Sequence, residues 1–303
     1  MTSASPTVTA GGAKPSAVTR LSGALHKRPR LRLAGLLSAP VLWLVVAYLG
    51  SLAVMFATAF WSVNSFTGSV IREPTLDNFR TLLTEDVYRT IALRSLSVAA
   101  AVTVIDALIA LPMAFYLAKV AAPRTRTFLV AAILTPLWAS YLVKVYAWRT
   151  MLSGDGVINW ALGPFGLKGP GFGVVATTLT LAYLWLPYMI LPIYAGFERL
   201  PNSLLEASGD LGASAGRTFR SVVLPLVYPS IVAGSIFTFS LSLGDFIAVK
   251  IVGGATQLYA NVIYDSIGVA NDLPFAAAAA FFPVIVIVIY LILVRRTGAL
   301  ENL

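Results

Sequence analysis

Long apolar stretches alternate with short polar segments from about residue 33 to the end of the sequence. A transmembrane helix needs roughly 20 apolar residues to cross a hydrocarbon core of about 30 Å. Six stretches meet this requirement, at approximately residues 33–61, 93–119, 128–148, 172–197, 227–252 and 275–294. We therefore predict an all-α polytopic membrane protein with six transmembrane helices.

A polar segment precedes the first apolar stretch. Residues 1–33 are rich in Ser, Thr, Ala, Gly and Pro and then become basic, a composition typical of disordered segments. The apolar stretch that follows exceeds the 7–15 residues or so of a signal-peptide core, so we expect it to remain as an anchor. The sequence thus predicts a disordered basic tail over 1–33 and a transmembrane domain over 34–303.

The composition agrees with a membrane protein and excludes several kinds of site. Hydrophobic residues make up 58% of the 303 residues and charged residues 12%, whereas soluble domains carry about 25% charged residues. The chain has no cysteine, and its single histidine, His26, lies in the basic tail. Disulfides and cysteine-based metal sites are excluded, and we expect this chain to bind no metal or cofactor.

Basic residues are distributed unevenly between the predicted loops. Six spans place both termini on one side of the membrane, and fourteen of the 22 Lys and Arg residues fall on that side. Because short cytoplasmic loops carry the excess of Lys and Arg, we predict that both termini are cytoplasmic. This location accounts for the formal net charge of +9 and favours membrane lipid over nucleic acid as a partner.

One cytoplasmic segment, about residues 198–225, predicts a short surface helix followed by a turn. Pro201 suits the first turn of a helix, and Gly212 permits the tight turn that ends one. An apolar side that could contact a partner is formed by Leu204, Leu205, Ala207 and Leu211. The alternative is an ordinary loop that links two membrane helices.

The spacing within this segment favours the first interpretation. Gly212 follows the pair Glu206-Ala207. Nine residues separate Gly212 from Val222, and one residue separates Val222 from the pair Leu224-Pro225. This spacing resembles the EAA loop of ABC importer permeases, although serine replaces the second alanine and valine replaces an isoleucine. The resemblance implies a type I importer fold and assigns contact with an ATPase to Leu204, Leu205, Glu206, Ala207, Gly212 and Pro225.

The resemblance also implies partner chains. The sequence contains no Gly-Lys dipeptide, so a P-loop with its essential Gly-Lys pair is impossible here. We therefore expect no enzyme activity in this chain and expect ATP and Mg²⁺ to bind separate subunits. The implied assembly comprises a second homologous permease subunit, two ATP-binding subunits and an extracytoplasmic substrate-binding protein.

Three further segments resemble spermidine/putrescine permeases. They read TLDNF at residues 75–79, KVYAW at residues 144–148 with GDGVIN at 154–159, and LGDF at residues 243–246 with VGG at 252–254. Their order agrees with the predicted topology, although lysine stands at 144 where arginine is expected. The resemblance implies import of a polyamine across a bacterial inner membrane by a multi-pass protein.

Two acidic residues lie within the predicted spans, where burial is costly unless the charge is paired or functional. Asp245 falls in the outer half of the fifth span and could hold a cation released by the binding protein. Alternatively, it pairs with Lys144 or caps backbone groups near Gly244. Asp106 lies mid-span among apolar residues, where a role in transport and a role in packing or hydrogen bonding between helices both remain open.

Aromatic residues recur along the third span. Trp138, Tyr141, Val145 and Trp148 share one helix face, and aromatic rings attract alkylammonium groups through cation–π contacts. The alternative is an aromatic belt at the membrane interface. As a functional hypothesis, we assign Asp245, Tyr141 and Trp148 to the substrate pathway.

Three other functions remain as alternatives. The first is an ABC importer permease for another small solute, such as an amino-acid derivative, a phosphonate or ferric ion. The second is an ion-coupled secondary carrier, which would show inverted repeats with broken helices. The third is an intramembrane enzyme, which the absence of histidine, cysteine and paired carboxylates from the spans disfavours.

Overall fold

The computed structural model describes residues 29–64 and 66–298 of the chain. The chain divides into two units, Met1–Ala57 and Thr58–Leu303. The expected tail at 1–33 lies mostly outside the described residues, and its last residues, 29–33, are helical. In the first unit, α2 (Pro29–Trp43), the π-helix η1 (Leu44–Leu49) and α3 (Gly50–Thr58) follow without interruption.

The second unit is helical apart from one short hairpin among its described residues. Strands β1 (Ser62–Val63) and β2 (Val70–Ile71) pair antiparallel, with Ser62 opposite Ile71. The helices are α4 (Asp77–Thr84), α5 (Asp86–Phe115), η2 (Tyr116–Val120), α6 (Pro123–Trp138), α7 (Tyr141–Leu152), α8 (Val157–Leu162), η3 (Gly163–Phe165), α9 (Val174–Arg199), α10 (Asn202–Asp210), α11 (Ala215–Thr218), η4 (Phe219–Val223), α12 (Leu224–Gly244), α13 (Ile247–Val252), α14 (Tyr259–Gly268), α15 (Leu273–Val294) and η5 (Arg295–Thr297).

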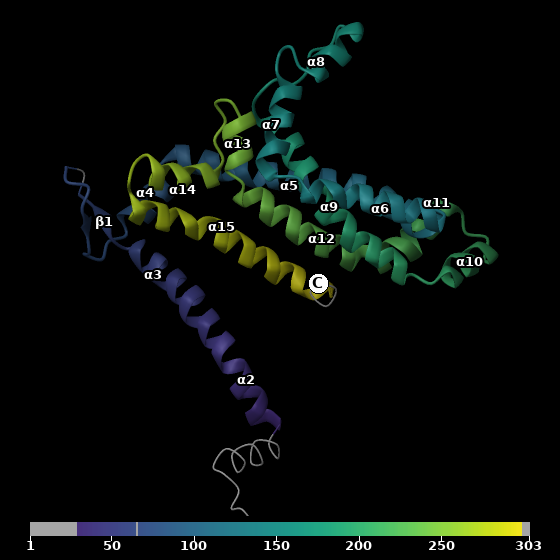
Figure 1. Ribbon diagram of the computed structural model, residues 1–303, viewed down its shortest axis with the longest axis horizontal. Coiled ribbons are helices and arrows are strands. Elements are labelled where there is room, and N and C mark those ends of the chain that lie inside the picture. The colour runs from purple at the N-terminus through teal and green to yellow at the C-terminus, as the bar shows by residue number, and fades with distance from the viewer. Residues whose placement is uncertain (1–28, 65, 299–303) are drawn as a thin grey trace, which may run out of the picture. The chain divides into compact units, whose positions relative to one another are not determined.

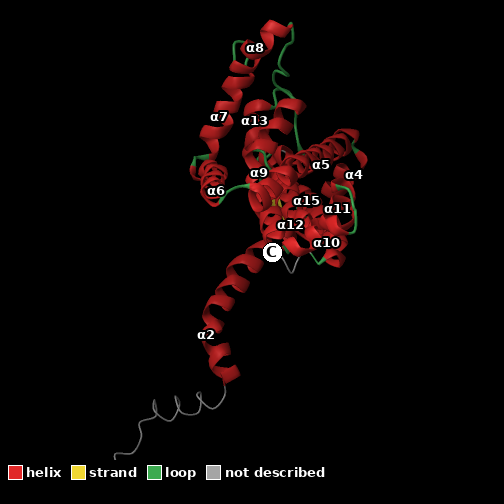
Figure 2. Ribbon diagram, turned by 90° about the vertical axis from the view of Figure 1, so that its right-hand side faces the viewer, coloured by secondary structure: helices red, strands yellow, loops and turns green. Residues whose placement is uncertain are grey.

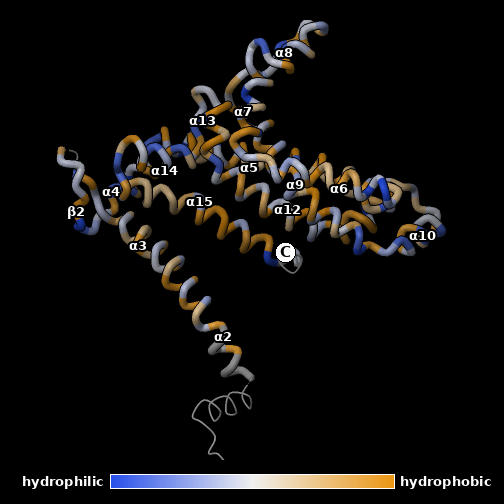
Figure 3. Tube along the Cα trace, viewed as in Figure 1, coloured by the Kyte–Doolittle hydropathy of each residue, from blue (hydrophilic) through white to orange (hydrophobic). Residues whose placement is uncertain are grey.

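Five helices within the described residues are long and apolar enough to cross a membrane. A bent pair of helices brings the number to six if the pair counts as one span. These helices confirm the polytopic all-helical fold. Figure 3 shows the hydrophobic character along the C-terminal half of α15, one of the five. The five are Leu37–Thr58, Asp86–Val120, Val174–Arg199, Ala215–Gly244 and Leu273–Val294.

The third predicted span, 128–148, is broken rather than continuous. Its two parts, α6 and the segment Tyr141–Phe165, meet at an angle of 96°. Ala139 and Ser140 adopt ψ angles of 143° and 134°, which are extended values, and Pro136 removes a helical hydrogen bond donor just before them. As a result, α7 and α8 extend away from α5, α9 and α12 (Figure 1, Figure 2).

The fifth predicted span, 227–252, is interrupted as well. Helix α12 ends at Gly244, and Asp245 has an extended ψ of 118°. Chain direction then changes before α13, which begins at Ile247. The apolar stretch is therefore one membrane helix followed by a short separate helix.

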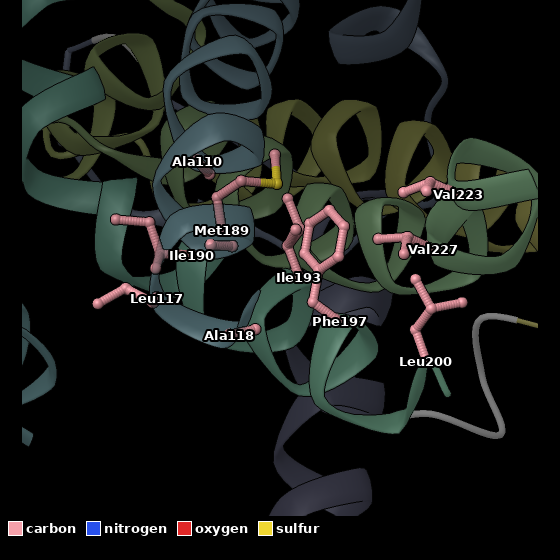
Figure 4. Packing of buried hydrophobic residues seen from close by; sticks show 11 residues of the cluster. Ala110, Leu117, Ala118, Met189, Ile190, Ile193, Phe197, Leu200, Val223 and Val227 are labelled. Carbon is pink, nitrogen blue, oxygen red and sulfur yellow. The ribbon is translucent and has the colours of Figure 1, made fainter. Parts of the chain in front are cut away.

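The core of the second unit lies where α5, α9 and α12 pack together. Figure 4 shows the ring of Phe197 between Ile193 and Val227. The helices approach closely at Gly234, because a Cβ atom there would lie 2.7 Å from the sulfur and 3.1 Å from the carbonyl oxygen of Met189. Small residues at such points permit close helix packing in membranes.

Helix α10 and the hairpin occupy opposite ends of the long helices (Figure 1). Val294, at the end of α15, packs with Val232 and Ala233 of α12. The connection from α9 to α10 comprises only Leu200 and Pro201. Helix α10 is therefore attached directly to a membrane-spanning helix.

Candidate functional site

The two helix breaks described above meet each other. Tyr141 is the first residue of α7, and Asp245 directly follows α12. The Tyr141 hydroxyl donates a hydrogen bond to the Asp245 carboxyl group. Two residues that the sequence analysis assigned to the substrate pathway are thus brought together.

Asp245 also organises the short helix that follows it. Its Oδ1 accepts a hydrogen bond of 2.9 Å from the backbone N–H of Ala248, which caps α13 in the manner of an N-terminal Asp. The side chain is nearly buried, since Asp245 is 8% exposed. Of the structural roles considered from the sequence, backbone capping is present, whereas no ion pair with Lys144 occurs among the described residues.

A cavity of about 320 Å³ opens beside this pair. The Trp185 ring stacks against Tyr141, with ring centroids 6.1 Å apart. The aromatic contacts continue from Trp185 to Tyr188 at 5.9 Å and from Tyr188 to Phe237 at 6.4 Å. The cavity is lined by Tyr141, Trp185, Ser240, Leu241, Gly244, Asp245, Phe246 and Ile247.

Trp185 was missed in the sequence analysis because it lies within an ordinary apolar span. Its indole Nε1 is buried and has no hydrogen-bond partner among the described residues. The spacing of Trp185 and Tyr188 places both rings near one face of α9, which is the signal that could have identified them. Tyr141 and Trp185 give the cavity an aromatic wall next to the Asp245 carboxyl group, and Tyr188 contacts Trp185 from outside the lining.

Trp148 does not belong to this cavity. Its ring lies 5.5 Å from that of Tyr183, on another part of α9. Trp138 lies on the other side of the break in the third span and is 90% exposed. The single aromatic face expected over 138–148 therefore does not form, because the helix that would carry it is interrupted.

Asp106 lies apart from the residues that line the cavity. It is completely buried within α5, and neither carboxyl oxygen has a hydrogen-bond partner in the described part of the chain. The hydrogen bond between helices considered from the sequence is therefore not formed. Neighbouring positions on the same helix, Val102 and Ala110, belong to the buried apolar clusters.

The motif at residues 206–225 forms the predicted helix and turn. Helix α10 spans Asn202–Asp210, and Gly212 follows it at a φ of 76°, a backbone conformation that favours glycine. The Ser208 and Thr218 hydroxyl groups lie 2.8 Å apart in a hydrogen bond. This contact holds α10 against α11, and Pro225 lies in the first turn of α12.

The apolar residues of α10 divide between two directions. Leu205 packs against the buried cluster at the ends of α5 and α9. Leu204 is 41% exposed and Leu211 is 88% exposed, while Glu206 and Ala207 are also exposed. The side available to a partner therefore contains Leu204, Ala207 and Leu211, and Leu205 instead attaches the helix to its own chain.

Comparison with known proteins identifies the kind of molecule that carries these features. The family of binding-protein-dependent transport system inner membrane components matches residues 91–297. The chain belongs to this family. It is an ABC importer permease and a multi-pass protein of the bacterial inner membrane.

Relatives with similar sequences are transport subunits. The permease is 43% identical over 299 residues to the inner membrane ABC transporter permease protein YdcU of Escherichia coli (strain K12), covering 94% of this chain and 95% of that protein. It is 30% identical over 282 residues to the spermidine/putrescine transport system permease protein PotB of Haemophilus influenzae, covering 91% and 96%. The permease is thus a transport subunit rather than an enzyme, and ATP hydrolysis belongs to separate chains.

Solved structures have the same fold. A bacterial ABC transporter for import of the acidic polysaccharide alginate matches with a TM-score of 0.72 at 17% identity, covering 92% of this chain and 98% of that one. The same type of transporter in complex with a periplasmic protein bound to an alginate pentasaccharide matches with a TM-score of 0.69, also at 17% identity, covering 93% and 98%. At this identity the likeness concerns the fold alone.

Proposed function

We propose that the permease imports polyamine-like organic cations. The observation that carries this proposal is the Tyr141–Asp245 pair beside the Trp185 ring. A carboxylate attracts an ammonium group, and an aromatic face adds cation–π attraction. The 30% identity to a spermidine/putrescine permease supports the same class of cargo.

The cavity is suited to transient contact with the cargo rather than to tight binding. Its volume of about 320 Å³ lies near the lower limit of about 300 Å³ for small-molecule sites. One carboxyl group faces it, so it can neutralise one ammonium group of a polyamine at a time. Strong selection of the cargo then belongs to the extracytoplasmic binding protein.

The movement of the ATP-binding subunits is passed to the permease at α10. In this proposal the termini and α10 are cytoplasmic, and the exposed side formed by Leu204, Ala207 and Leu211 contacts an ATP-binding subunit. Two such subunits, a second homologous permease and a binding protein complete the assembly. ATP-driven closure moves α10 and rocks the attached membrane helices, so that the cavity at Asp245 opens alternately to the two sides.

Competition during uptake tests the proposal. The permease is reconstituted in proteoliposomes with its partner subunits and binding protein. Uptake of labelled putrescine is measured with unlabelled spermidine, neutral solutes, an amino-acid derivative, a phosphonate or ferric ion present. Competition by the polyamine alone is the expected result. Competition by an amino-acid derivative, a phosphonate or ferric ion instead would reassign the cargo, and uptake without ATP would identify a secondary carrier.

A further inference from the structure

A lysine side chain connects the start of α10 to a second membrane helix. Lys119 lies in η2, the π-helical end of the span that begins with α5. Its Nζ donates hydrogen bonds to the carbonyl oxygen of Leu200 at 2.5 Å and to Oδ1 of Asn202 at 3.0 Å. Leu200 precedes α10 and Asn202 begins it, so the ammonium group bridges η2 to the junction of α9 and α10.

The ammonium group is suited to this position. The last carbonyl groups of a helix lack helical partners and carry partial negative charge. Lys119 supplies a charged donor to this end of α9, and such hydrogen bonds are stronger than those between neutral groups. At the start of α10, Lys119 donates to the side chain of Asn202, the first residue of that helix.

Arg126 connects a third helix, α6, to the ends of η2 and α9. Its guanidinium group donates a hydrogen bond of 3.2 Å to the carbonyl oxygen of Ala118, the neighbour of Lys119 in η2. It also lies 3.7 Å from a carboxylate oxygen of Glu198, near the end of α9. The ends of the α5, α6 and α9 spans are therefore connected to one another by polar contacts next to α10.

The apolar contacts at this junction are of a different kind. Leu200 belongs to the same buried cluster as Leu117 and Ala118 (Figure 4). Leu205 packs against that cluster. Apolar contacts are non-directional, so they hold α10 near η2 but do not determine the direction in which η2 moves when α10 moves. The hydrogen bonds of Lys119 define that direction.

We propose that Lys119 is a positioning residue that transmits the movement of α10 to α5. This inference rests on the proposed function, in which α10 receives the movement of an ATP-binding subunit. The two-residue connector carries that movement to α9, and Lys119 carries it at the same time to η2 and α5. Both helices pack against α12, which ends at Gly244 directly before Asp245, so their joint displacement reaches the cavity.

The ratio of uptake to ATP hydrolysis tests this role. The variant Lys119→Met keeps a long apolar side chain and removes the donor. In the reconstituted complex, we expect copurification of the ATP-binding subunits as in the wild type. We expect uptake per ATP hydrolysed to be about tenfold lower, because α5 no longer follows α10 through the hydrogen bonds of Lys119; this factor is equivalent to about 1.4 kcal/mol.

Three further variants define the contact. Lys119→Arg retains a charged donor and is expected to restore most of the ratio. Asn202→Ala removes one of the two acceptors and is expected to have an intermediate effect. Arg124→Met changes an exposed cation of α6 and is the matched control for loss of positive charge, with an unchanged ratio expected.

The outcomes separate this inference from the proposed function. An unchanged ratio in Lys119→Met would overturn the role of Lys119 while leaving the docking of α10 intact. Loss of copurification in that variant would also overturn it, because Lys119 would then serve only to fold α10. Failure of the wild-type permease to bind ATP-binding subunits through α10 would instead contradict the proposed function itself.

Discussion

The Tyr141 hydroxyl group donates a hydrogen bond to the carboxyl group of Asp245, a residue 104 positions later in the chain. Each residue lies at a helix break, at the start of α7 and the end of α12. The bond therefore joins two interrupted helices at one point. The same carboxyl group caps α13, so any molecule that competes for it also affects the helices around it.

Replacing the Asp245 carboxyl group by an amide should weaken cation transport selectively. Asp245→Asn keeps one side-chain oxygen, which can accept from Ala248 as Oδ1 does now, replaces the oxygen that accepts from Tyr141 by an NH2 group, and removes the charge. We expect the KM for putrescine uptake to rise roughly tenfold or more, as for loss of a charged interaction of about 1.5–3 kcal/mol, at an unchanged protein level. Uptake kinetics measure the effect, with Asp265→Asn at the exposed Lys250 ion pair as control. Unchanged kinetics would leave Asp245 with a structural role alone.

The two neighbouring leucines of α10 should respond differently to substitution. Leu204→Glu places a charge on the exposed side, so we expect loss of copurification with the ATP-binding subunits and little change in the Tm of the isolated permease. Leu205→Ala removes packing against the buried cluster and should lower the free energy of unfolding by about 1–2 kcal/mol, less than the roughly 2–5 kcal/mol of a fully buried site. Copurification and thermal unfolding in detergent distinguish the two variants. The same response from both would contradict the division of α10 into an exposed side with Leu204 and a packed side with Leu205.

The turn after α10 should require glycine at one position only. Gly212 has a φ of 76° and open space around its Cα, so Gly212→Ala costs backbone strain of about 1–2 kcal/mol without a steric clash. Gly209 lies inside α10 and also has open space, so Gly209→Ala should stabilise the helix by up to about 1 kcal/mol. Thermal unfolding of the two variants gives opposite shifts in Tm. Equal shifts would show that the turn adapts to a side chain.

Close packing between α9 and α12 should be sensitive to a single methyl group. Gly234→Ala adds a Cβ atom that meets the side chain and the backbone of Met189, and overpacking of this kind costs about 1–3 kcal/mol. Gly216→Ala, in α11, meets no atom within 4 Å and serves as the control. A lower Tm in the first variant alone is expected. A wild-type Tm for Gly234→Ala would indicate that the two helices separate easily.

Much of the fold could be predicted from the sequence because apolar length is a strong signal in a membrane. Most of the spans and the helix α10 were predicted correctly, and Gly212 occupies the expected turn. The breaks at Ser140 and Asp245 were not predicted. Both lie within continuous apolar stretches, and the hydrogen bond beside them joins residues distant in the sequence.

The candidate site was predicted only in part, because it also depends on contacts between residues distant in the sequence. Asp245 was identified as an acidic residue within a span and Tyr141 as part of an aromatic face, but Trp148, on the same helix α7, contacts Tyr183 and does not line the cavity. Trp185 has no unusual neighbours in the sequence and acquires its place only through packing of α9. Similarly, Leu204 and Leu205 are identical in kind, and only the tertiary structure determines which of them faces outward.

The facing breaks at residues 139–140 and 245–246 also have a consequence for hydration. Backbone groups that leave a helix at membrane depth are tolerated only where they are covered by protein or line a water-filled space. The cavity beside Asp245 has room for water within this chain. Water that reaches it can solvate backbone groups at the breaks and an arriving ammonium ion, so the cargo need not lose its whole hydration shell at once.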